Sequence, residues 1–296
     1  MRTLLVDVDS TIPNLALMHI SSWRKELGDE VGFNVADPDR VYASCVFDWN
    51  RHKTDGLRTF YPRAEIDIGG SGISLSQSER IPSEVWTMSP DYTLYPECDY
   101  DLGFTTRGCI RNCHFCVVPK KEGRLHRYQH PSEFHHPSHR KAVYMDNNIL
   151  ADREWFFEVT DWCLSNKIRV DFNQGLDIRL MDSEITDRLA KLKPINQWRI
   201  AFDSMAYREP LEKGLKLMDR SGVNLRHRVE AYVYVHDGTQ VEDAVERCNI
   251  LRRYGVMPYP MFNRHAKRTQ AMTDLKRWTR PWIFYSTEWT DYRRGQ

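Results

Sequence analysis

Three cysteines that lie close together are the residues of this sequence with the clearest potential for chemistry. Cys109, Cys113 and Cys116 have the spacing Cys-x3-Cys-x2-Cys, and Phe115 stands directly before the third cysteine. Thiolates in one short loop can converge on a metal. Three thiolates on a four-iron cluster leave one iron without a protein ligand, and that open position can admit a substrate or a cofactor.

Zinc is the alternative metal for the same three thiols. A structural zinc site needs a fourth ligand, and a histidine-rich stretch follows the cysteines. Its members are His126, His130, His135, His136 and His139. The spacing alone leaves both metals open. Three unrelated buried cysteines are the weakest interpretation, because chance rarely places three so densely beside a glycine-containing turn.

The other four cysteines have simpler interpretations. Cys163 and Cys248 fall on apolar faces of expected helices, and Cys45 lies in an expected strand, so we predict that all three belong to the core. Cys98 stands just ahead of the cluster, and we expect it not to be a ligand. The chain has seven cysteines, an odd number, so we expect no disulfide framework.

Regularly spaced apolar runs predict the elements that must position the cysteine cluster. The runs lie near residues 101–107, 142–146, 168–172, 197–202, 229–235 and 256–262. Helical patterns separate most of them, which predicts an α/β protein with a parallel sheet, open or curled towards a barrel. The cysteines directly follow the first run, so we expect them in a loop at the carboxyl edge of the sheet.

Apolar residues at helical spacing predict which side of each helix is buried. The expected faces are Trp155, Val159, Trp162 and Cys163; Ile185, Leu189 and Leu192; Leu211, Leu215 and Met218; and Val241, Val245, Cys248 and Leu251.

The cysteine spacing, the aromatic residue before Cys116 and the six strand–helix units resemble the radical S-adenosylmethionine (SAM) superfamily, over about residues 96–280. The resemblance implies a partial (βα)6 barrel of the TIM type and a [4Fe–4S] cluster on Cys109, Cys113 and Cys116. SAM would bind the open iron through its amino and carboxylate groups. The implied reaction is reductive cleavage of SAM to a 5′-deoxyadenosyl radical, which abstracts hydrogen from an unidentified substrate. A low-potential electron donor such as flavodoxin or ferredoxin is also implied.

The resemblance implies cofactor contacts at Phe115, within the motif, and at the ends of the later strands. Asp146 and Asn147 end the second run, where the superfamily contacts the SAM amino group. Turn chemistry at the strand end is an equal alternative for these two residues.

Two further strand ends offer similar positions. Gln174 and Arg179 could meet SAM or substrate, although Arg179 could instead form an ion pair with Asp177. Asp203 and Ser204 resemble the position that binds the ribose hydroxyls of SAM, although Ser204 could simply cap the next helix.

Residues 1–95 predict a short Rossmann-like unit that ends in a linker, ahead of the barrel at 96–296. Strands are expected near 3–8, 41–47 and 64–68, and a helix is marked by Ala16, Ile20, Trp23 and Leu27. The unit resembles the cobalamin-binding domain of one radical SAM branch. It lacks the Asp-x-His-x-x-Gly motif of the cobalt ligand, so we interpret it as a degenerate relative and do not expect cobalamin. The Gly69-Gly70-Ser71-Gly72 turn is weak evidence for a phosphate cradle.

The C-terminal segment is a basic and aromatic extension of the barrel. Its residues are Arg264, His265, Lys267, Arg268, Lys276, Arg277, Arg280, Arg293 and Arg294, interleaved with Trp278, Trp282, Phe284 and Trp289. Such a mixture can bind nucleic acid, but it also occurs where a last helix packs by its aromatic residues. A nucleotide or nucleic-acid substrate, modified by methyl or methylthio transfer, therefore stays a second option.

The composition excludes several other classes of protein. The chain has 296 residues, of which 41% are hydrophobic and 28% are charged, and its net charge is +1. These values are typical of a folded globular protein rather than a disordered or fibrous chain. No apolar run is long enough to cross a bilayer. We therefore predict a cytoplasmic protein without a membrane partner.

Overall fold

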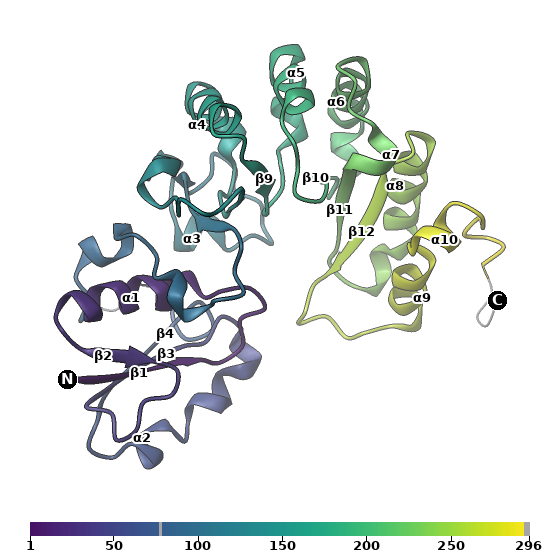
Figure 1. Ribbon diagram of the computed structural model, residues 1–296. Helices are drawn as coiled ribbons and strands as arrows, with labels where there is room; N and C mark the ends of the chain where they lie inside the picture. The colour runs from purple at the N-terminus through teal and green to yellow at the C-terminus, as the bar shows by residue number, and fades with distance from the viewer. Residues whose placement is uncertain (77–78, 293–296) are drawn as a thin grey trace. The chain divides into compact units, whose positions relative to one another are not determined.

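The computed structural model describes residues 1–76 and 79–292, apart from the side chain of Thr239. The chain divides into two compact units, Met1–Val143 and Tyr144–Gln296, and both contain strands and helices (Figure 1). The boundary that the sequence suggested, at residue 95, falls inside the first unit. Within the described residues, no helix is long and apolar enough to cross a membrane.

The first unit begins with a four-stranded parallel sheet in the order β2-β1-β3-β4. Its strands are β1 (Arg2–Asp7), β2 (Glu30–Gly32), β3 (Arg40–Ser44) and β4 (Glu65–Gly69). The strands predicted near 3–8, 41–47 and 64–68 are confirmed as β1, β3 and β4. The prediction missed β2, because three residues are too few to show an alternating pattern.

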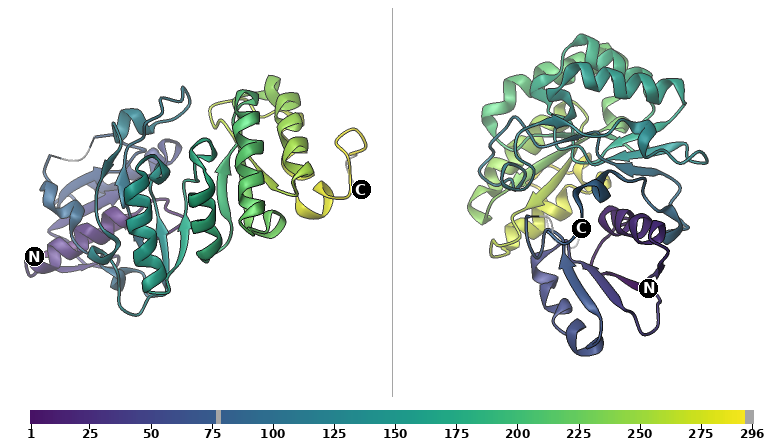
Figure 2. Two further views of the ribbon diagram at one scale, coloured as in Figure 1. Left: turned by 90° about the horizontal axis from the view of Figure 1, so that it is seen from above. Right: turned by 90° about the vertical axis from the view of Figure 1, so that its left-hand side faces the viewer.

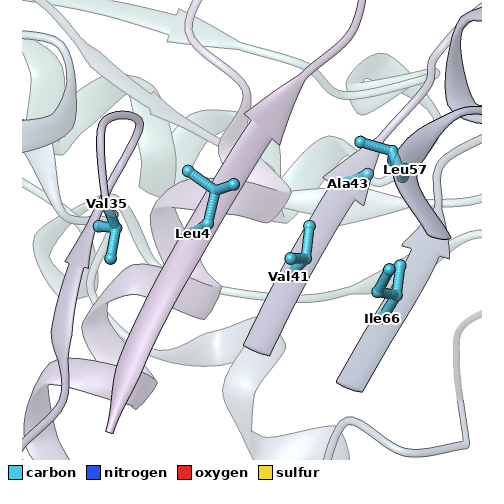
Figure 3. Close-up of a cluster of buried hydrophobic side chains, with 6 residues drawn as sticks. All are labelled: Leu4, Val35, Val41, Ala43, Leu57 and Ile66. Carbon is cyan, nitrogen blue, oxygen red and sulfur yellow. The ribbon is translucent and has the colours of Figure 1, made fainter. Parts of the chain in front are cut away.

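Successive side chains of a strand point to opposite faces of the sheet. In this sheet apolar side chains are buried on both faces. On one face Leu4, Val41 and Ile66 pack together, joined by Leu57 of α2 (Leu57–Phe60) (Figure 3). On the other face Leu5 and Tyr42 pack against residues of α1 (Leu15–Glu26) and of the short helix η2 (Ser83–Thr87).

The helix α1 lies where the sequence predicted a helix, but its buried side differs from the prediction. Leu17, Met18 and Ile20 are buried, whereas Leu27 is exposed. Leu27 falls just after the last helical turn and before Gly28, whose positive φ of 82° ends the helix as expected. The predicted spacing from Ala16 to Leu27 therefore extended one residue beyond the end of the helix.

The rest of the first unit consists of short elements. They are η1 (Asp48–Thr54), η3 (Tyr92–Leu94), β5 (Asp101–Gly103), β6 (Thr106–Arg107), α3 (Val118–Lys121), β7 (His126–Arg127), η4 (Pro131–Glu133) and β8 (Lys141–Tyr144). β5 lies beside β8, and β6 pairs with β7 in the antiparallel sense. Tyr128 and Gln129 donate to the carbonyls of Trp86 and Thr87 in η2, which itself packs on the N-terminal sheet. The hydroxyl of Tyr95 donates to Asp7 at the end of β1.

A buried carboxylate fixes the start of β5. The side chain of Asp101 is 1% exposed and accepts hydrogen bonds from Nδ1 of His135 at 2.6 Å and Nδ1 of His139 at 2.8 Å. The backbone N–H of His136 donates to the same carboxylate at 2.9 Å. Three donors therefore stabilise a charged group that would otherwise be costly to bury.

The second unit contains four further strands and a series of helices. The strands are β9 (Arg169–Phe172), β10 (Trp198–Ala201), β11 (Val229–Val235) and β12 (Met257–Phe262). β10, β11 and β12 form a parallel sheet in that order. The helices are α4 (Arg153–Ser165), α5 (Ser183–Lys191), α6 (Arg208–Arg220), α7 (Leu225–Arg228), α8 (Val241–Arg253), α9 (Gln270–Trp278) and α10 (Pro281–Phe284), with short turns at η5 (Ile149–Ala151), η6 (Ile178–Leu180), η7 (Met205–Tyr207) and η8 (Gly238–Gln240).

The helices α4, α5, α6 and α8 follow one another in chain order along one side of these strands (Figure 2). The apolar faces predicted for them are buried at nearly every position; Trp162 is only partly buried. All six apolar runs predicted beyond residue 100 contain strands, and the class of an α/β protein with parallel sheets is confirmed. The first run is divided into β5 and β6.

Replacing Asp101 should destabilise the first unit strongly. Asp101→Ala leaves two histidines and a backbone N–H without their buried acceptor, and we expect the free energy of unfolding to fall by about 3–5 kcal/mol. The measurement is urea unfolding followed by tryptophan fluorescence. Asp99→Ala is the matched control, because the Asp99–Lys141 pair is largely exposed and should contribute about 0–1 kcal/mol. Equal effects of the two substitutions would contradict the role given to Asp101.

Candidate functional site

The three cysteines lie in residues 108–125, a segment that we call the cysteine loop. The antiparallel pair β6–β7 closes the base of this loop, with Arg107 opposite His126. Just inside the base, the N–H of Cys109 donates to the carbonyl of Gly123 at 3.3 Å. The two ends of the loop are therefore held together, and the cysteines follow the predicted strand region as the sequence indicated.

Gly108 allows the two ends of the cysteine loop to approach closely. Its φ is +77°, and a Cβ atom at this position would lie 2.2 Å from the carbonyl oxygen of Arg124. Only glycine fits such a contact without moving the backbone. Gly123 also has a positive φ, of 73°, but nothing lies within 4 Å of its missing Cβ.

The side chain of Arg107 braces the base from one side. Its Nη1 atom donates to Oε2 of Glu122 at 2.6 Å. The guanidinium also lies 4.0 Å from the ring centre of Phe104 and 4.9 Å from that of Tyr128. An ion pair and two cation–π contacts on one planar group fix its orientation.

Cysteine thiolates are the usual protein ligands of iron–sulfur clusters. None of the three thiols in the cysteine loop is in a disulfide, and all three are partly buried. The backbone N–H of Arg111 donates to Sγ of Cys109, with an N···S distance of 3.3 Å. Within the described residues, however, no group of three His, Cys, Asp or Glu side chains is arranged so that it could hold a metal ion. The loop gathers the thiols without converging them on one point.

The five histidines downstream all use Nδ1 in a hydrogen bond within the first unit. The partners are the carbonyl of Arg124 for His126, Ser132 Oγ for His130, Asp101 for His135 and His139, and Ser138 Oγ for His136. The stretch that suggested a zinc ligand thus contains the clamp on β5, and zinc stays an untested alternative.

In the second unit, the predicted cofactor residues follow the ends of β8, β9 and β10. Asp146 is buried, Asn147 is partly buried and Gln174 is exposed. Arg179 forms a two-pronged ion pair with Asp177, with N···O distances of 2.6 and 2.9 Å, and its guanidinium lies 4.4 Å from the ring centre of Tyr207. The ion pair that was the alternative for Arg179 is therefore present.

The local alternative is also present for Ser204. Its Oγ accepts the N–H of Ala206 and caps η7. Beside it, Oδ1 of Asp203 accepts the N–H of Tyr234 at 3.0 Å. Burial raises the pKa of Asp203, and this effect exceeds the opposing effects of the Tyr234 N–H and of the guanidinium groups of Arg247 and Arg179. The structure thus brings Asp203 near Arg179, a predicted pair of cofactor residues.

The sequence analysis missed Arg247, which organises the surroundings of Asp203. Its side chain is 1% exposed and donates to the carbonyls of Phe202 at 2.7 Å and Tyr234 at 2.9 Å. Its Nε binds Asp243 at 2.9 Å, four residues earlier on α8. One feature of the sequence could have revealed this residue: Arg247 is a charged side chain between Val245 and Cys248, on the helix face predicted to be apolar.

Three of the remaining cysteines belong to the core, as the sequence predicted. Cys45, Cys163 and Cys248 are buried, and burial raises the pKa of Cys248 to about 12. Cys45 follows β3 rather than lying within it. Cys98 is partly buried, and its Sγ lies 3.2 Å from the carbonyl of Tyr100.

The glycine turn after β4 packs against the chain itself. A Cβ on Gly70 would lie 2.3 Å from the carbonyl oxygen of Cys45, and one on Gly72 would lie 2.6 Å from the carbonyl carbon of Phe47. These glycines are therefore needed for close contact with residues 45–47, which is a sufficient reason for the motif without a phosphate.

The C-terminal aromatic residues are mostly part of the core. Trp278 and Phe284 are fully buried, with ring centres 5.1 Å apart, whereas Trp282 is exposed. Arg252 lies 5.8 Å from the ring centre of Phe284 and pairs with Glu288. Packing therefore accounts for Trp278 and Phe284, whereas the basic residues of the segment that the structure describes are exposed. Arg293 and Arg294 lie outside the described residues.

Comparison with known proteins found no family model that matches the chain and no curated protein that matches it.

Replacing Gly108 should loosen the base of the cysteine loop. Gly108→Ala forces the backbone at Arg124 to move, and we expect the amide of Cys109 to exchange with deuterium about tenfold faster or more. Gly123→Ala is the matched control, since it adds a left-handed backbone cost of about 1–2 kcal/mol without a collision. If both variants exchange alike, the close approach at Gly108 does not hold the loop.

The burial of Asp203 makes stability depend on pH. Because its folded-state pKa is raised, the proton binds more tightly in the folded state, and stability from this group falls as the pH rises through that pKa. Asp203→Asn should therefore stabilise the protein near pH 8 relative to wild type, with a gain that shrinks towards about pH 4. Denaturant unfolding across this range measures it, with the exposed Asp219→Asn as the control. A gain that does not depend on pH would contradict this account.

Proposed function

We propose that this protein is a radical SAM enzyme. The observation that carries the proposal is the cysteine loop, in which three thiols with the spacing Cys-x3-Cys-x2-Cys lie in one segment fixed at its base. Their chemistry suits a cluster that leaves one iron open. In this proposal Cys109, Cys113 and Cys116 hold a [4Fe–4S] cluster, and Phe115 lies beside the cofactor.

The cluster, when bound, would supply the electron that cleaves SAM to methionine and a 5′-deoxyadenosyl radical, and that radical takes a hydrogen atom from the substrate. The residues of the cysteine loop would hold the three thiols in place. The fixed base keeps the three thiols within one segment, and the N–H of Arg111 donates to Sγ of Cys109.

The strand ends of the second unit are proposed to bind SAM. Asp146 and Asn147 would accept hydrogen bonds from its ammonium group. Asp203 and Ser204 would meet the ribose hydroxyls, and the buried carboxylate of Asp203 is held in place by the Tyr234 N–H and the Arg247 network. Gln174 and Arg179 would line the same edge, with Arg179 oriented by Asp177.

The parallel arrangement of strands supports this proposal at the level of fold class. In the second unit, β10, β11 and β12 run parallel, and helices α4, α5, α6 and α8 lie along one side of the strands. Side chains after parallel strands share one edge, where α/β proteins bind ligands. We propose that the six strands from β5 to β12, without the β6–β7 pair, belong to a partial (βα)6 barrel. A cytoplasmic location and a protein electron donor are part of the proposal.

Removing any one of the three cysteines should abolish SAM cleavage. Cys109→Ala, Cys113→Ala and Cys116→Ala each leave the cluster one ligand short. We expect each to lose 5′-deoxyadenosine formation by at least about a hundredfold after anaerobic reconstitution with iron and sulfide and reduction with dithionite. The measurement combines product analysis with iron and zinc content.

Cys98→Ala is the matched control, because Cys98 lies in the same unit but outside the motif. It should keep wild-type iron content and cleavage. A wild-type protein that binds zinc and forms no 5′-deoxyadenosine would replace this proposal with a zinc-stabilised binding module.

A further inference from the structure

One face of the strands β11 and β12 carries aromatic side chains that remain accessible. Burial alternates along β11, so every second residue is only partly buried. In the parallel register Tyr232 lies beside Tyr259, and Tyr234 lies beside Met261. Tyr259 is 51% exposed and Met261 is 45% exposed, and the rings of Tyr232 and Tyr259 meet edge to face with their centres 5.8 Å apart. Aromatic rings on an open sheet face form a platform on which unpaired bases can stack.

A basic segment leaves the carboxyl end of β12 beside this face. Residues 263–269, which we call the basic loop, contain no acidic residue. Its exposed basic side chains are Arg264, His265, Lys267 and Arg268. Lys267 and Arg268 form no ion pair within the part of the chain that the structure describes, and the guanidinium of Arg268 lies 4.5 Å from the ring centre of Phe262. Their charges are therefore available to phosphate groups.

Both ends of the basic loop are fixed. At its start the N–H of Asn263 donates to the carbonyl of Val235 at 2.9 Å, and the amide nitrogen of the Asn263 side chain lies 3.3 Å from Nδ1 of His236. At its end Oγ1 of Thr269 accepts the N–H of Met272 at 3.2 Å and caps α9. The basic side chains are therefore held at the carboxyl end of β12, close to the exposed tyrosine.

The acidic side chains of the neighbouring strands have cationic neighbours of their own. Asp171 on β9 pairs with Nη1 of Arg199, and Oε2 of Glu230 on β11 lies 3.8 Å from Nε of the same arginine. Asp203, which follows β10, lies near the buried guanidinium of Arg247. The charges of Lys267 and Arg268 have no such internal partner. This asymmetry favours an anionic ligand at the basic loop.

An acidic protein and a nucleic acid both complement a positive loop, and the aromatic platform distinguishes between them. Single-stranded nucleic acid is bound where basic side chains follow the phosphates and aromatic rings stack on the bases. The second unit supplies both groups on adjoining segments, the basic loop and β12. The bases of a duplex are already stacked on one another, so a duplex cannot use the rings in this way.

We propose that the open face of β11 and β12, together with the basic loop, binds single-stranded nucleic acid. Tyr259 stacks on a base beside Tyr232, and Lys267 and Arg268 contact phosphate groups of the same strand. The inference goes beyond the proposed function, because such binding requires neither a cluster nor SAM.

The test measures binding of the full chain to labelled, mixed-sequence RNA and DNA strands of about 12 nucleotides by fluorescence anisotropy. Tyr259→Ala should weaken binding about tenfold or more, because one stacked base is lost. Tyr259→Phe keeps the ring and should bind like wild type. Phe60→Ala is the matched control, because it removes a ring that is 76% exposed in the first unit, and it should leave the affinity unchanged.

The double variant Lys267→Gln/Arg268→Gln tests the phosphate contacts. The plot of log Kd against log salt concentration should become shallower by about 1.4, since each contact to a single strand contributes about 0.7. Lys213→Gln/Lys216→Gln is the matched control, because it removes two exposed positive charges from α6. This control should keep the wild-type slope.

Binding of the RNA strand, of the DNA strand or of both would support the surface and identify the nucleic acid. A wild-type chain that binds neither strand would overturn the proposal. So would an equal loss in Tyr259→Ala and Tyr259→Phe, or an equal change of slope in the α6 control. A duplex of the same sequence, or a poly-glutamate peptide of the same charge, that binds as tightly as the strand would also overturn it. None of these measurements involves iron or SAM, so their failure is distinct from failure of the proposed function.

Discussion

The buried carboxylate of Asp101 is the interaction on which the position of the cysteine loop depends. It stands at the first residue of β5, and its three hydrogen bonds bind the segment around His135 and His139 to that strand. A charge in this position is tolerated only because every bond is present. Tyr92 adds a second tie, since its hydroxyl accepts the N–H of Leu102 and donates to the carbonyl of Phe134. The strand that leads into the loop is thus fixed before the cysteines begin.

From that fixed strand, two local devices shape the cysteine loop. The β6–β7 pair and the contact of Gly108 with Arg124 hold its two ends together, and Arg107 braces the base by pairing with Glu122. Bringing the two ends of a long loop together costs conformational entropy. Here the contacts at the base offset that cost, so the ends stay in register although the loop itself is exposed. The same construction leaves Ile110, Phe115 and Val117 exposed on the loop.

The sequence predicted the elements better than it predicted the polar contacts. Period-two and helical patterns located six strands and most helix faces, because burial of apolar side chains imposes those periods directly. The sequence did not predict β2, because this strand has only three residues. It wrongly placed Leu27 on the buried face of α1. The roles of Asp101, His135 and Arg247 could not be foreseen, since each depends on partners far away in sequence or on carbonyls of other strands. The histidine stretch shows the difficulty: its composition suggested a metal ligand, and two of its members clamp a strand.

The N-terminal sheet has the topology of a ligand-binding unit, yet its carboxyl edge is filled by the chain itself. In a parallel sheet of order β2-β1-β3-β4, the connection changes direction beside β1, which is where such folds bind ligands. There Asp9 accepts the N–H groups of Val46 and Phe47, at 2.7 and 3.0 Å, and the hydroxyl of Tyr95 donates to Asp7 at 2.7 Å. Burial alone would raise the pKa of Asp9, but these donors together with Asn50 lower it, so the carboxylate is committed to this internal clamp. Groups that would face a nucleotide or cofactor thus join the sheet to residues 46–47 and 95. The unit is best understood as the support on which β5 and the cysteine loop are built.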